Sequence, residues 1–326
     1  MIHLHPQIRG RLSVVAEGKV GSPDLSGDGR SVVYNEYVNG NEDVRLSRDG
    51  QVSELSSDPR AEIHPAVSRD GSTVVWNRFS STDFTDPDAS WDVVGIRDGQ
   101  PIVVSERNSN EMSPDLSADG RLAVWDENIG GGRYDRNIQR WDGSECKPIT
   151  EGEGTNMYPK VSPDGSRVVW RRFEDGKASL WLQDQAGAVK PLLENEHGLF
   201  GVALDEHGQN VAVCAGGEQD KDLYLYHEPT NTMTLVAGER GVDEEAPAIS
   251  CDGQAVAFEH WDWRGGTPAR VNIYLKQGEG QPQQVTMADE GLNMGPVLSA
   301  DGKTMVWTWV DAKDVDHRKI LKLELE

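Results

Sequence analysis

Two sets of polar side chains recur at fixed distances from a proline and an aromatic residue that the sequence repeats. Three residues before the repeated proline stand Glu62, Glu111, Asn156, Glu244 and Asn293. Two residues after the repeated aromatic residue stand Glu36, Arg78, Glu127, Arg172, His260 and Trp309. Equivalent positions of stacked repeats form a ring, so both sets are expected around one opening of the fold.

These residue types can do acid–base chemistry or bind a polar ligand. Neighbouring carboxylates with separated pKa values can act as acid and base, and an imidazole can transfer protons near neutral pH. The candidate catalytic residues are His260, Glu62, Glu111, Glu244, Arg78 and Arg172. The polar and ring candidates for ligand binding are Glu36, Glu127, Asn156, Asn293, Trp309 and His64, which precedes Pro65. The structural alternative is that these side chains pair with one another and with loop backbone.

Two insertions add aromatic residues that the repeat does not require. They are Ser80–Trp91 and Trp261–Ala269. Their aromatic residues, which we take as further candidates for ligand binding, are Phe84, Trp91, Trp261 and Trp263. Exposed tryptophans often mark a binding surface, although such residues can also pack their own loop against the scaffold.

Metal and thiol chemistry have weaker support in the sequence. Two acidic runs could supply oxygen ligands for Ca²⁺, namely Asp83, Asp86, Asp88, Asp92 and Asp311, Asp314, Asp316. Neither run has the spacing of an EF-hand loop, so no metal site and no cofactor is predicted. Cys146, Cys214 and Cys251 are too few to form a disulfide framework, and Cys214 lies in an apolar run typical of a core residue.

The elements that would position these residues belong to one repeat, which occurs seven times. Typical copies are YPKVSPDGSRVVW from Tyr158 and SPDLSADGRLAVW from Ser113. The shared glycines recur every 42 to 49 residues, at Gly29, Gly71, Gly120, Gly165, Gly208, Gly253 and Gly302. Such a period suits one four-stranded blade of a β-propeller. Within each unit, an apolar strand ends in an Asp-Gly turn and a second strand rich in valine and aromatic residues follows.

The chain ends determine the expected number of blades. The seventh repeat supplies three strands, the third at Ile320–Leu325, and the N-terminal segment Arg11–Glu17 forms one strand outside the repeats. Pairing these two would complete the last blade and cover its edge. The prediction is an all-β fold, a single seven-bladed propeller behind an N-terminal tail of residues 1–10. The blades span about 22–58, 63–105, 112–150, 157–194, 200–237, 245–286, and 294–326 with 11–17.

The Pro-x-x-Ser-x-Asp-Gly core followed by Val-Val-Trp resembles the TolB-type (PD40) propeller repeat. The resemblance covers residues 12–326 and implies a propeller fold, whereas proteins with this repeat differ widely in function. The chain differs from TolB itself because no α/β domain precedes the propeller, no export signal is visible, and seven blades are expected where TolB has six. No hydrolase domain or Gly-x-Ser-x-Gly motif accompanies the repeats, so a peptidase is not expected.

Charge and hydropathy limit the partners. The net charge of −23 repels phosphate backbones, so nucleic-acid binding is not expected. No stretch is apolar enough for a transmembrane helix. We expect a monomer that is cytoplasmic as written, or periplasmic or secreted if a signal peptide has been removed. The first hypothesis is a non-enzymatic scaffold that binds a protein, peptide or small molecule at its irregular loops and channel mouth; the alternative is a hydrolase, lyase or cyclase acting there.

Overall fold

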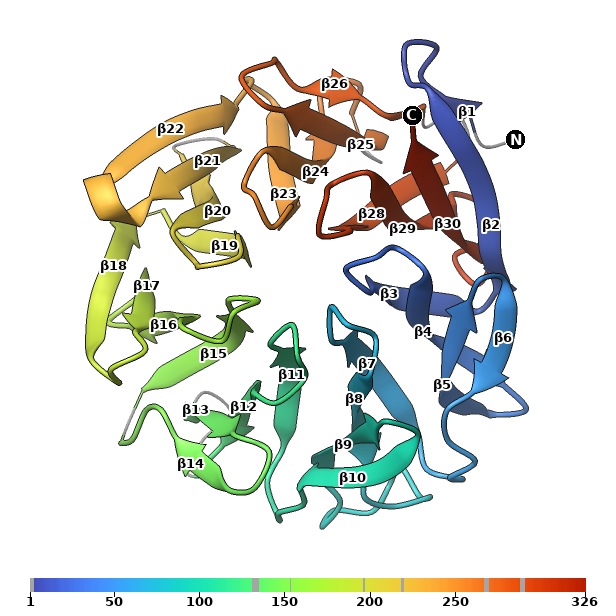
Figure 1. Cartoon of the computed structure of the whole chain (residues 1–326), viewed down its shortest axis with the longest axis vertical. Coiled ribbons are helices and arrows are strands. Elements are labelled where there is room, and N and C mark those ends of the chain that lie inside the picture. The colour runs from blue at the N-terminus through green and yellow to red at the C-terminus, as the bar shows by residue number, and fades with distance from the viewer. Residues whose placement is uncertain are drawn as a thin grey trace.

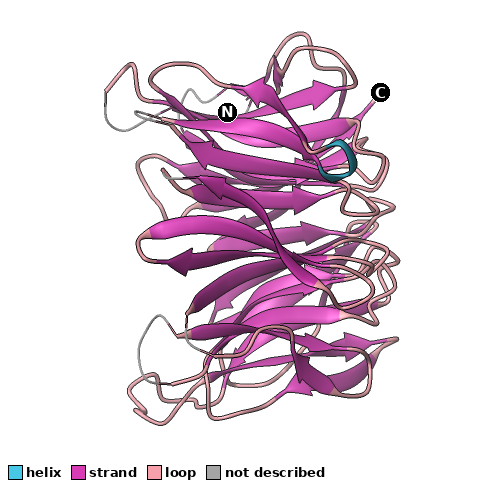
Figure 2. Ribbon diagram, turned by 90° about the vertical axis from the view of Figure 1, so that its left-hand side faces the viewer, coloured by secondary structure: helices cyan, strands magenta, loops and turns pink. Residues whose placement is uncertain are grey.

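The fold consists of β-strands that cross the thickness of a disc (Figure 2). The computed structural model describes residues 3–130, 135–152, 154–195, 197–217, 220–266, 270–287 and 291–326. In these ranges the only helical element is a short 3₁₀ turn, η1 (Glu228–Thr230). Valine and aromatic residues are frequent in strands such as Ser31–Val38 and Thr73–Phe79 because their side chains pack well on a pleated, half-buried surface.

Four strand positions recur from the axis outward. The innermost strands are β3 (Val20–Leu25), β7 (Glu62–Val67), β11 (Glu111–Leu116), β15 (Thr155–Val161), β19 (Leu199–Leu204), β23 (Val242–Ile249) and β28 (Gly291–Leu298). The second strands are β4 (Ser31–Val38), β8 (Thr73–Phe79), β12 (Ala123–Asn128), β16 (Val168–Glu174), β20 (Asn210–Gly216), β24 (Ala255–Asp262) and β29 (Thr304–Asp311). The third strands are β5 (Asn41–Arg48), β9 (Trp91–Arg97), β13 (Arg136–Trp141), β17 (Lys177–Gln183), β21 (Lys221–His227), β25 (Arg270–Gln277) and β30 (Arg318–Leu325). The outermost strands are β6 (Gln51–Glu54), β10 (Gln100–Ser105), β14 (Cys146–Pro148), β18 (Val189–Asn195), β22 (Thr232–Ala237), β26 (Gln283–Gln284) and β2 (Gly10–Gly18).

The strands form antiparallel sheets that stand around a central axis, with the innermost strands facing it (Figure 1). Five sheets have four strands. The two sets from β11 to β14 and from β15 to β18 are joined into one eight-stranded sheet by a single parallel pairing of Arg136 with Thr155.

The N-terminal segment reaches two sheets. Strand β2 pairs along its length with β30, from Gly10 opposite Leu325 to Gly18 opposite Arg318. Upstream of it, β1 (His3–Leu4) pairs with β27 (Thr286–Met287). Residues 3 and 4, which the sequence placed in a free tail, are therefore held by backbone pairing. Met1 and Ile2, in the same tail, lie outside the described residues.

The repeated Ser-x-Asp-Gly turns have one common structure. In the first, the Ser26 hydroxyl donates to Asp28 at 2.6 Å and accepts the Ser31 N–H at 3.0 Å, while Asp28 also accepts the Arg30 N–H. The following glycine, Gly29, has φ of 72°, in the left-handed region that glycine occupies at little cost. The serine and aspartate side chains thus bond the turn's own backbone, as expected for a turn-forming motif.

Single backbone hydrogen bonds connect each of these turns to the next. The circuit runs Gly27 N–H to Arg69 O, Asp70 to Ala118, Ala118 to Pro163, Asp164 to Glu206, Glu206 to Cys251, Cys251 to Ala300 and Ala300 to Gly27, at 2.7 to 3.1 Å. The seven turns therefore form a closed circle on one face of the disc.

The core lies between neighbouring sheets. The repeated aromatic residues occupy it, and Trp125, Trp170, Phe258 and Trp307 are almost completely buried. One cluster joins Ile273 and Leu275 of β25 to Trp307 and Leu321 of the next sheet. Side chains that point out of a sheet are thus buried by the adjacent sheet, which is why a repeated unit of this kind is stable only as part of the array.

Two glycines with the same backbone conformation but different surroundings provide a test of this packing. Gly120 and Gly295 both have φ of 63°. A Cβ at Gly120 would lie 2.3 Å from Thr73 Oγ1, whereas a Cβ at Gly295 would meet nothing within 4 Å. Alanine at Gly295 should cost about 1 kcal/mol of unfolding free energy through its left-handed φ, and alanine at Gly120 about 2–3 kcal/mol because overpacking is added. Urea denaturation measures both, and equal costs would show that the turn tolerates the clash.

Candidate functional site

A cavity of about 1030 Å³ occupies the centre of the disc, where the innermost strands meet. Residues from all seven of these strands line it. Its wall is partly apolar, with Leu204, Ile249 and Leu298, and partly charged, with five carboxylates, three arginines, one lysine and one histidine. Pockets with such mixed walls are the usual sites of ligand binding.

A bulge at the proline shapes the wall of this cavity. The register of every innermost strand shifts at the repeated position, for example between Ile63 and Ala66 of β7 and between Met157 and Lys160 of β15. In six of these strands the residue before the proline has a left-handed φ of 46 to 63°, at Ser22, His64, Ser113, Tyr158, Ala246 and Gly295. Residues before proline normally avoid the α regions, so the same strained turn recurs around the cavity. We call these six residues and Gly201, which takes the same place in β19, the bulge positions.

The bulge positions give the cavity an uneven opening. Two carry large side chains, the exposed His64 and Tyr158, which is 45% exposed. Gly201, Ala246 and Gly295 on the other side are small. Both large residues line the cavity. His64, a candidate because it precedes Pro65, therefore lies in the cavity wall with an exposed side chain. Tyr158 was missed, although it occupies the same place in its repeat.

Deeper in the cavity, aspartates connect neighbouring strands. Asp24 Oδ2 accepts the Val67 N–H of the next innermost strand at 2.8 Å, and Asp115 Oδ2 accepts the Val161 N–H at 2.8 Å. Asp115 also accepts a hydrogen bond from Lys160 Nζ at 3.0 Å. Interaction with Asp115, and more weakly with Asp24, raises the pKa of Lys160. These contacts keep the lysine charged inside the cavity.

The two sets of polar residues predicted to form a ring are brought together in pairs. Opposite residues in the antiparallel register are Glu62 and Arg78, Glu111 and Glu127, Asn156 and Arg172, Glu244 and His260, and Asn293 and Trp309. The first member of each pair is buried, however, and none of these ten residues lines the cavity. Their expected place at the opening is thus corrected: because the bulge follows them, they lie between sheets, behind the cavity wall.

The amides of this set have structural contacts. Asn156 Oδ1 accepts the indole N–H of Trp170 at 3.0 Å, and its Nδ2 donates to the Arg136 carbonyl of the preceding third strand at 3.2 Å. Asn293 makes the same pair of contacts with Trp307 and Val271. Both amides therefore link a core tryptophan to the neighbouring sheet.

The glutamates at the same place are buried carboxyl groups. Glu62, Glu111 and Glu244 are at most 1% exposed. Burial raises the pKa of Glu62 and of Glu111 to about 7 and that of Glu244 to about 8. Such groups carry a proton at mildly acidic pH, and none of the three reaches the cavity.

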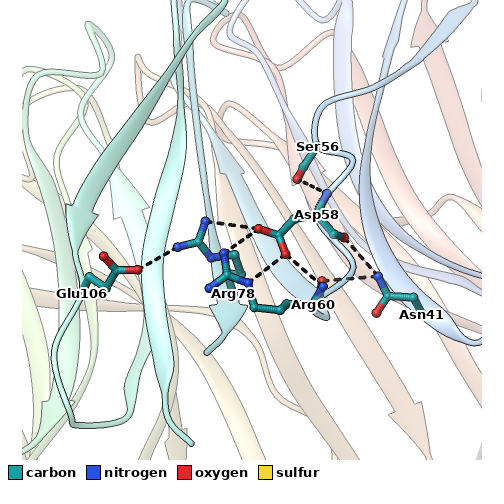
Figure 3. Close-up of polar contacts among 6 residues, drawn as sticks. All are labelled: Asn41, Ser56, Asp58, Arg60, Arg78 and Glu106. Atoms are coloured by element: carbon teal, nitrogen blue, oxygen red, sulfur yellow. Dashed lines mark hydrogen bonds and ion pairs between the residues drawn. The ribbon is translucent and has the colours of Figure 1, made fainter. Parts of the chain in front are cut away.

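The predicted arginines are held by local ion pairs. Figure 3 shows Arg78 between two carboxylates, with Nη1 3.6 Å from Asp58 and Nη2 3.1 Å from Glu106, while Arg60 also binds Asp58. Arg172 donates to Glu174 at 3.1 Å and lies over the ring of Trp181.

The remaining polar candidates also have partners. Glu36 accepts a hydrogen bond from Arg45 at 3.2 Å, and Glu127 binds Arg107 and the Ser109 hydroxyl, each at 2.8 Å. His260 is 9% exposed and stacks on Tyr274 at 4.3 Å, and burial lowers its pKa. Trp309 is equally buried and belongs to the core cluster of its sheet. These contacts match the structural alternative considered for both sets.

The loop aromatics pack in two small stacks outside the cavity. Phe84 is 64% exposed and stacks on Phe79 at 5.1 Å, and Trp91 from the other end of the same loop meets the Phe79 ring at 5.1 Å in a tilted orientation. Trp261 and Trp263 stack at 5.9 Å and donate to Glu259 and Asp243. Thr267–Ala269, the end of the second insertion, lie outside the described residues. Trp263, at 40% exposed, and Phe84 keep part of their ring surface open to solvent.

The described part of the chain has no cluster of metal-ligating side chains and no membrane-spanning helix. No group of three or more His, Cys, Asp or Glu side chains there is arranged to hold a metal ion. Asp83, from one of the acidic runs, instead accepts the N–H and hydroxyl of Thr85. Among the same residues, no helix has the length and apolar character needed to span a membrane.

Sheets standing around a central cavity define a β-propeller, and comparisons with known proteins agree. The PD40 family, described as the TolB beta propeller domain, matches residues 126–325. The chain belongs to this family, which confirms the resemblance inferred from its repeats. Among proteins with curated descriptions, none matches the chain in sequence.

Solved structures extend the likeness in fold over the whole chain. An oligogalacturonate lyase from Vibrio parahaemolyticus superposes with a TM-score of 0.75 at 12% identity, over 99% of this chain and 96% of that one. The propeller domain of the Trilobed protease from Pyrococcus furiosus gives 0.68 at 12% identity, over 96% and 95%. TolB from Acinetobacter baumannii gives 0.51 at 15% identity, over 95% and 64%. At these identities the likeness shows the fold alone.

Proposed function

We propose that this protein is a binding protein that takes its ligand into the central cavity through the end that carries the bulge positions. The observation that carries the proposal is the 1030 Å³ cavity itself, with charged groups in its wall and unequal side chains at its opening. The regular sheets fix the backbone, and the variable bulge positions on them determine which shapes can enter. The ligand classes are those expected from the sequence: a protein segment, a peptide or a small molecule.

The same proposal treats the fold as a monomeric, seven-bladed, cytoplasmic propeller with the blade limits given above, closed by the N-terminal strand. The circuit of seven turn-to-turn hydrogen bonds and the pairing of β2 with β30 support the blade count and the closure. The loop aromatics Phe84, Trp91, Trp261 and Trp263 would form an outer contact surface for a ligand that extends out of the cavity.

The proposal is tested by narrowing the opening. Ala246 already has the left-handed φ at which the chain carries a tyrosine in Tyr158, so Ala246→Tyr adds bulk without a new backbone conformation. Suitable probes are trigalacturonate, its methyl ester, triglutamate and triglutamine, measured by titration calorimetry. Ala246→Tyr should weaken any bound probe at least about tenfold, or 1.4 kcal/mol, and Ala246→Ser, which copies Ser22, should not. If Ala246→Tyr binds the probe as tightly as the parent protein, the ligand does not enter past Ala246 and the proposal is wrong.

An enzyme is the second candidate, and His64 is the observation that favours it. Its imidazole lines the cavity, and partial desolvation there lowers its pKa, so the ring is a neutral base at neutral pH. Two structures with the same fold are oligogalacturonate lyases, one of them in complex with manganese. Incubation with oligogalacturonate and detection of an unsaturated product by ultraviolet absorbance tests this candidate. Turnover that survives in His64→Gln would exclude His64 as the base.

A further inference from the structure

In the cavity wall, the carboxylates have partners within the protein, whereas the arginines have no direct ion pair with a described residue. This difference indicates the charge that a ligand there would carry. The inference rests on the proposed function of the cavity. The lining contains five carboxylates, Asp24, Glu42, Asp115, Glu245 and Glu259, and four permanent cations, Arg69, Lys160, Arg171 and Arg318. Each kind of charge can be followed to its partners.

All five carboxylates are occupied by donors of the protein. Asp24 and Asp115 accept the backbone and lysine donors described above. Glu259 accepts the Gly295 N–H and the Trp261 indole N–H, both at 2.6 Å. Glu42 accepts from Asn35 Nδ2 at 3.2 Å, and Glu245 pairs with Lys221. A cationic ligand would have to compete with these donors.

Two arginines of the wall, Arg171 and Arg318, donate to backbone carbonyls rather than to carboxylates. Among the described residues, no ion pair involves Arg69, Arg171 or Arg318, whereas Lys160 is paired with Asp115. This is unexpected in a chain with 55 acidic and 32 basic residues, because a guanidinium is always charged and loses stability when it is desolvated without a counter-charge.

Arg171 is the most constrained of the three. Its guanidinium lies 4.3 Å from the ring centroid of Tyr158, and its Nη1 donates to the Leu199 carbonyl at 3.0 Å. Its Nε is buried without a hydrogen-bond partner. Desolvation lowers the pKa of Arg171. The ring thus fixes the guanidinium plane against the cavity wall, where Arg171 makes no direct ion pair with a described carboxylate and interacts with Asp126 only at longer range.

Arg318 occupies a similar position in another sheet. Its Nε donates to the Val315 carbonyl at 2.7 Å. Its Nη1 lies 3.6 Å from the place where a Cβ on Gly21 would stand, so it reaches the bulge of β3. Asn35 is 9% exposed, and its buried Oδ1, which would lie 4.0 Å from the same point, has no hydrogen-bond partner. A guanidinium without a direct ion pair to a described carboxylate and an acceptor without a donor therefore lie at this part of the wall, although Glu42 and Asp316 act on Arg318 at longer range.

We propose that the cavity selects an oligomeric acid, whose carboxylates bind the guanidinium groups of Arg171 and Arg318. A guanidinium matches a carboxylate with two parallel hydrogen bonds. A hydroxyl or N–H next to the carboxylate would donate to Asn35 Oδ1, and the open surface of Tyr158 would contact the apolar side of the ligand. The two arginines belong to different sheets, so a chain of acidic units is the ligand that can use both.

Matched probes test the charge requirement and separate the two sources of such acids. Trigalacturonate is compared with its methyl ester, and triglutamate with triglutamine, by titration calorimetry of the full chain at low salt. At least one acid should bind about tenfold or more tightly than its neutral counterpart, and Arg171→Gln and Arg318→Gln should each weaken it about tenfold to a hundredfold. Arg121→Gln, on an arginine whose side chain is 80% exposed, is the matched control and should change nothing.

The outcomes distinguish this inference from the proposed function. A preference for trigalacturonate identifies an acidic sugar, and one for triglutamate an acidic peptide; either supports the inference. If neutral probes bind as well as acids, or if both glutamine variants keep full affinity, the inference is wrong, while loss of binding in Ala246→Tyr still supports the cavity as the site. If neither acid binds with a dissociation constant below about 1 mM, the cavity does not select carboxylates and the inference is wrong. Circular dichroism and the melting temperature show that each variant is folded.

Discussion

Replacing Asp126 by alanine is expected to lower the free energy of unfolding by about 3–5 kcal/mol, because the change strands a buried charge. Asp126 is 1% exposed and pairs with Arg136, which is 8% exposed. Arg136 also donates to the Asn110 and Asp126 carbonyls, at 3.3 and 3.1 Å, but these neutral acceptors cannot replace the carboxylate. Asp126 Oδ2 accepts the Tyr158 N–H at 3.2 Å as well, so the same substitution loosens one of the bulge positions.

The double variant Asp126→Leu, Arg136→Met separates the contribution of the ion pair to stability from the contribution of packing. A buried pair gains little net free energy over apolar residues of similar volume, so the double variant should recover most of the lost stability. Urea denaturation measures all the variants. If Asp126→Ala costs less than about 1 kcal/mol, Arg136 has found solvent or another acceptor, and the pair is not a buried one.

The stability of the protein is expected to fall as the pH rises from about 5 to about 8, because three buried glutamates hold protons in the folded state. The folded pKa values of Glu62, Glu111 and Glu244, about 7, 7 and 8, lie above the ordinary value of 4.5. The folded chain therefore binds more protons than the unfolded chain between these values. The contribution is complete below pH 4.5 and is lost as the pH passes through 7 and 8, amounting to about 1–3 kcal/mol for each group.

Glutamine at all three positions is the direct test. The amide is uncharged at every pH, and Asn156 and Asn293 show that an amide fits the equivalent place. The triple variant should show a much flatter dependence of melting temperature on pH and should exceed the parent protein at pH about 8. Glu145→Gln, on a side chain that is 59% exposed, is the control. An unchanged slope in the triple variant would mean that other groups set the pH dependence.

Carboxylates with a lowered pKa have the opposite effect on stability: they make the fold less stable as the pH falls. Hydrogen bonds and neighbouring charges lower the pKa of Asp164 and of Asp262 to about 2, led among favourable contacts by His207 for the first and by Arg264 for the second. Such groups stabilise the fold above the ordinary value of 3.8 and lose that contribution as the pH falls toward 2. The melting temperature is thus expected to be highest near pH 5.

Much of the strand order could be predicted because the turn chemistry is local. The Ser-x-Asp-Gly motif bonds its own backbone, so its position in the sequence fixes where the innermost strand ends and the second begins. The strand predicted at Arg11–Glu17 lies within one residue of the bounds of β2 at each end. The repeated aromatic residues share one face of the second strand, because side chains alternate along a strand, and they are buried.

The candidate site was harder to predict because one bulge changes which side chains face the axis. Glu62 and His64 are two residues apart, so in a regular strand both side chains would point to the same face of the sheet. The left-handed φ of His64 breaks the alternation, so consecutive residues Ile63 and His64 both line the cavity and Glu62 turns between the sheets. Nothing in the residue types indicates this conformation, because proline normally keeps its predecessor extended. Arg171 and Arg318 were missed because their place in the cavity wall depends on distant strands.

The circle of turn-to-turn hydrogen bonds also limits how the molecule can deform. Each turn donates one bond to a neighbour and accepts one from the other, so no sheet can move outward without stretching two bonds. A ligand that widens the cavity would therefore stretch all seven hydrogen bonds of the circle slightly instead of breaking one of them. Strain introduced at one turn would therefore be shared with the turns on the opposite side of the disc.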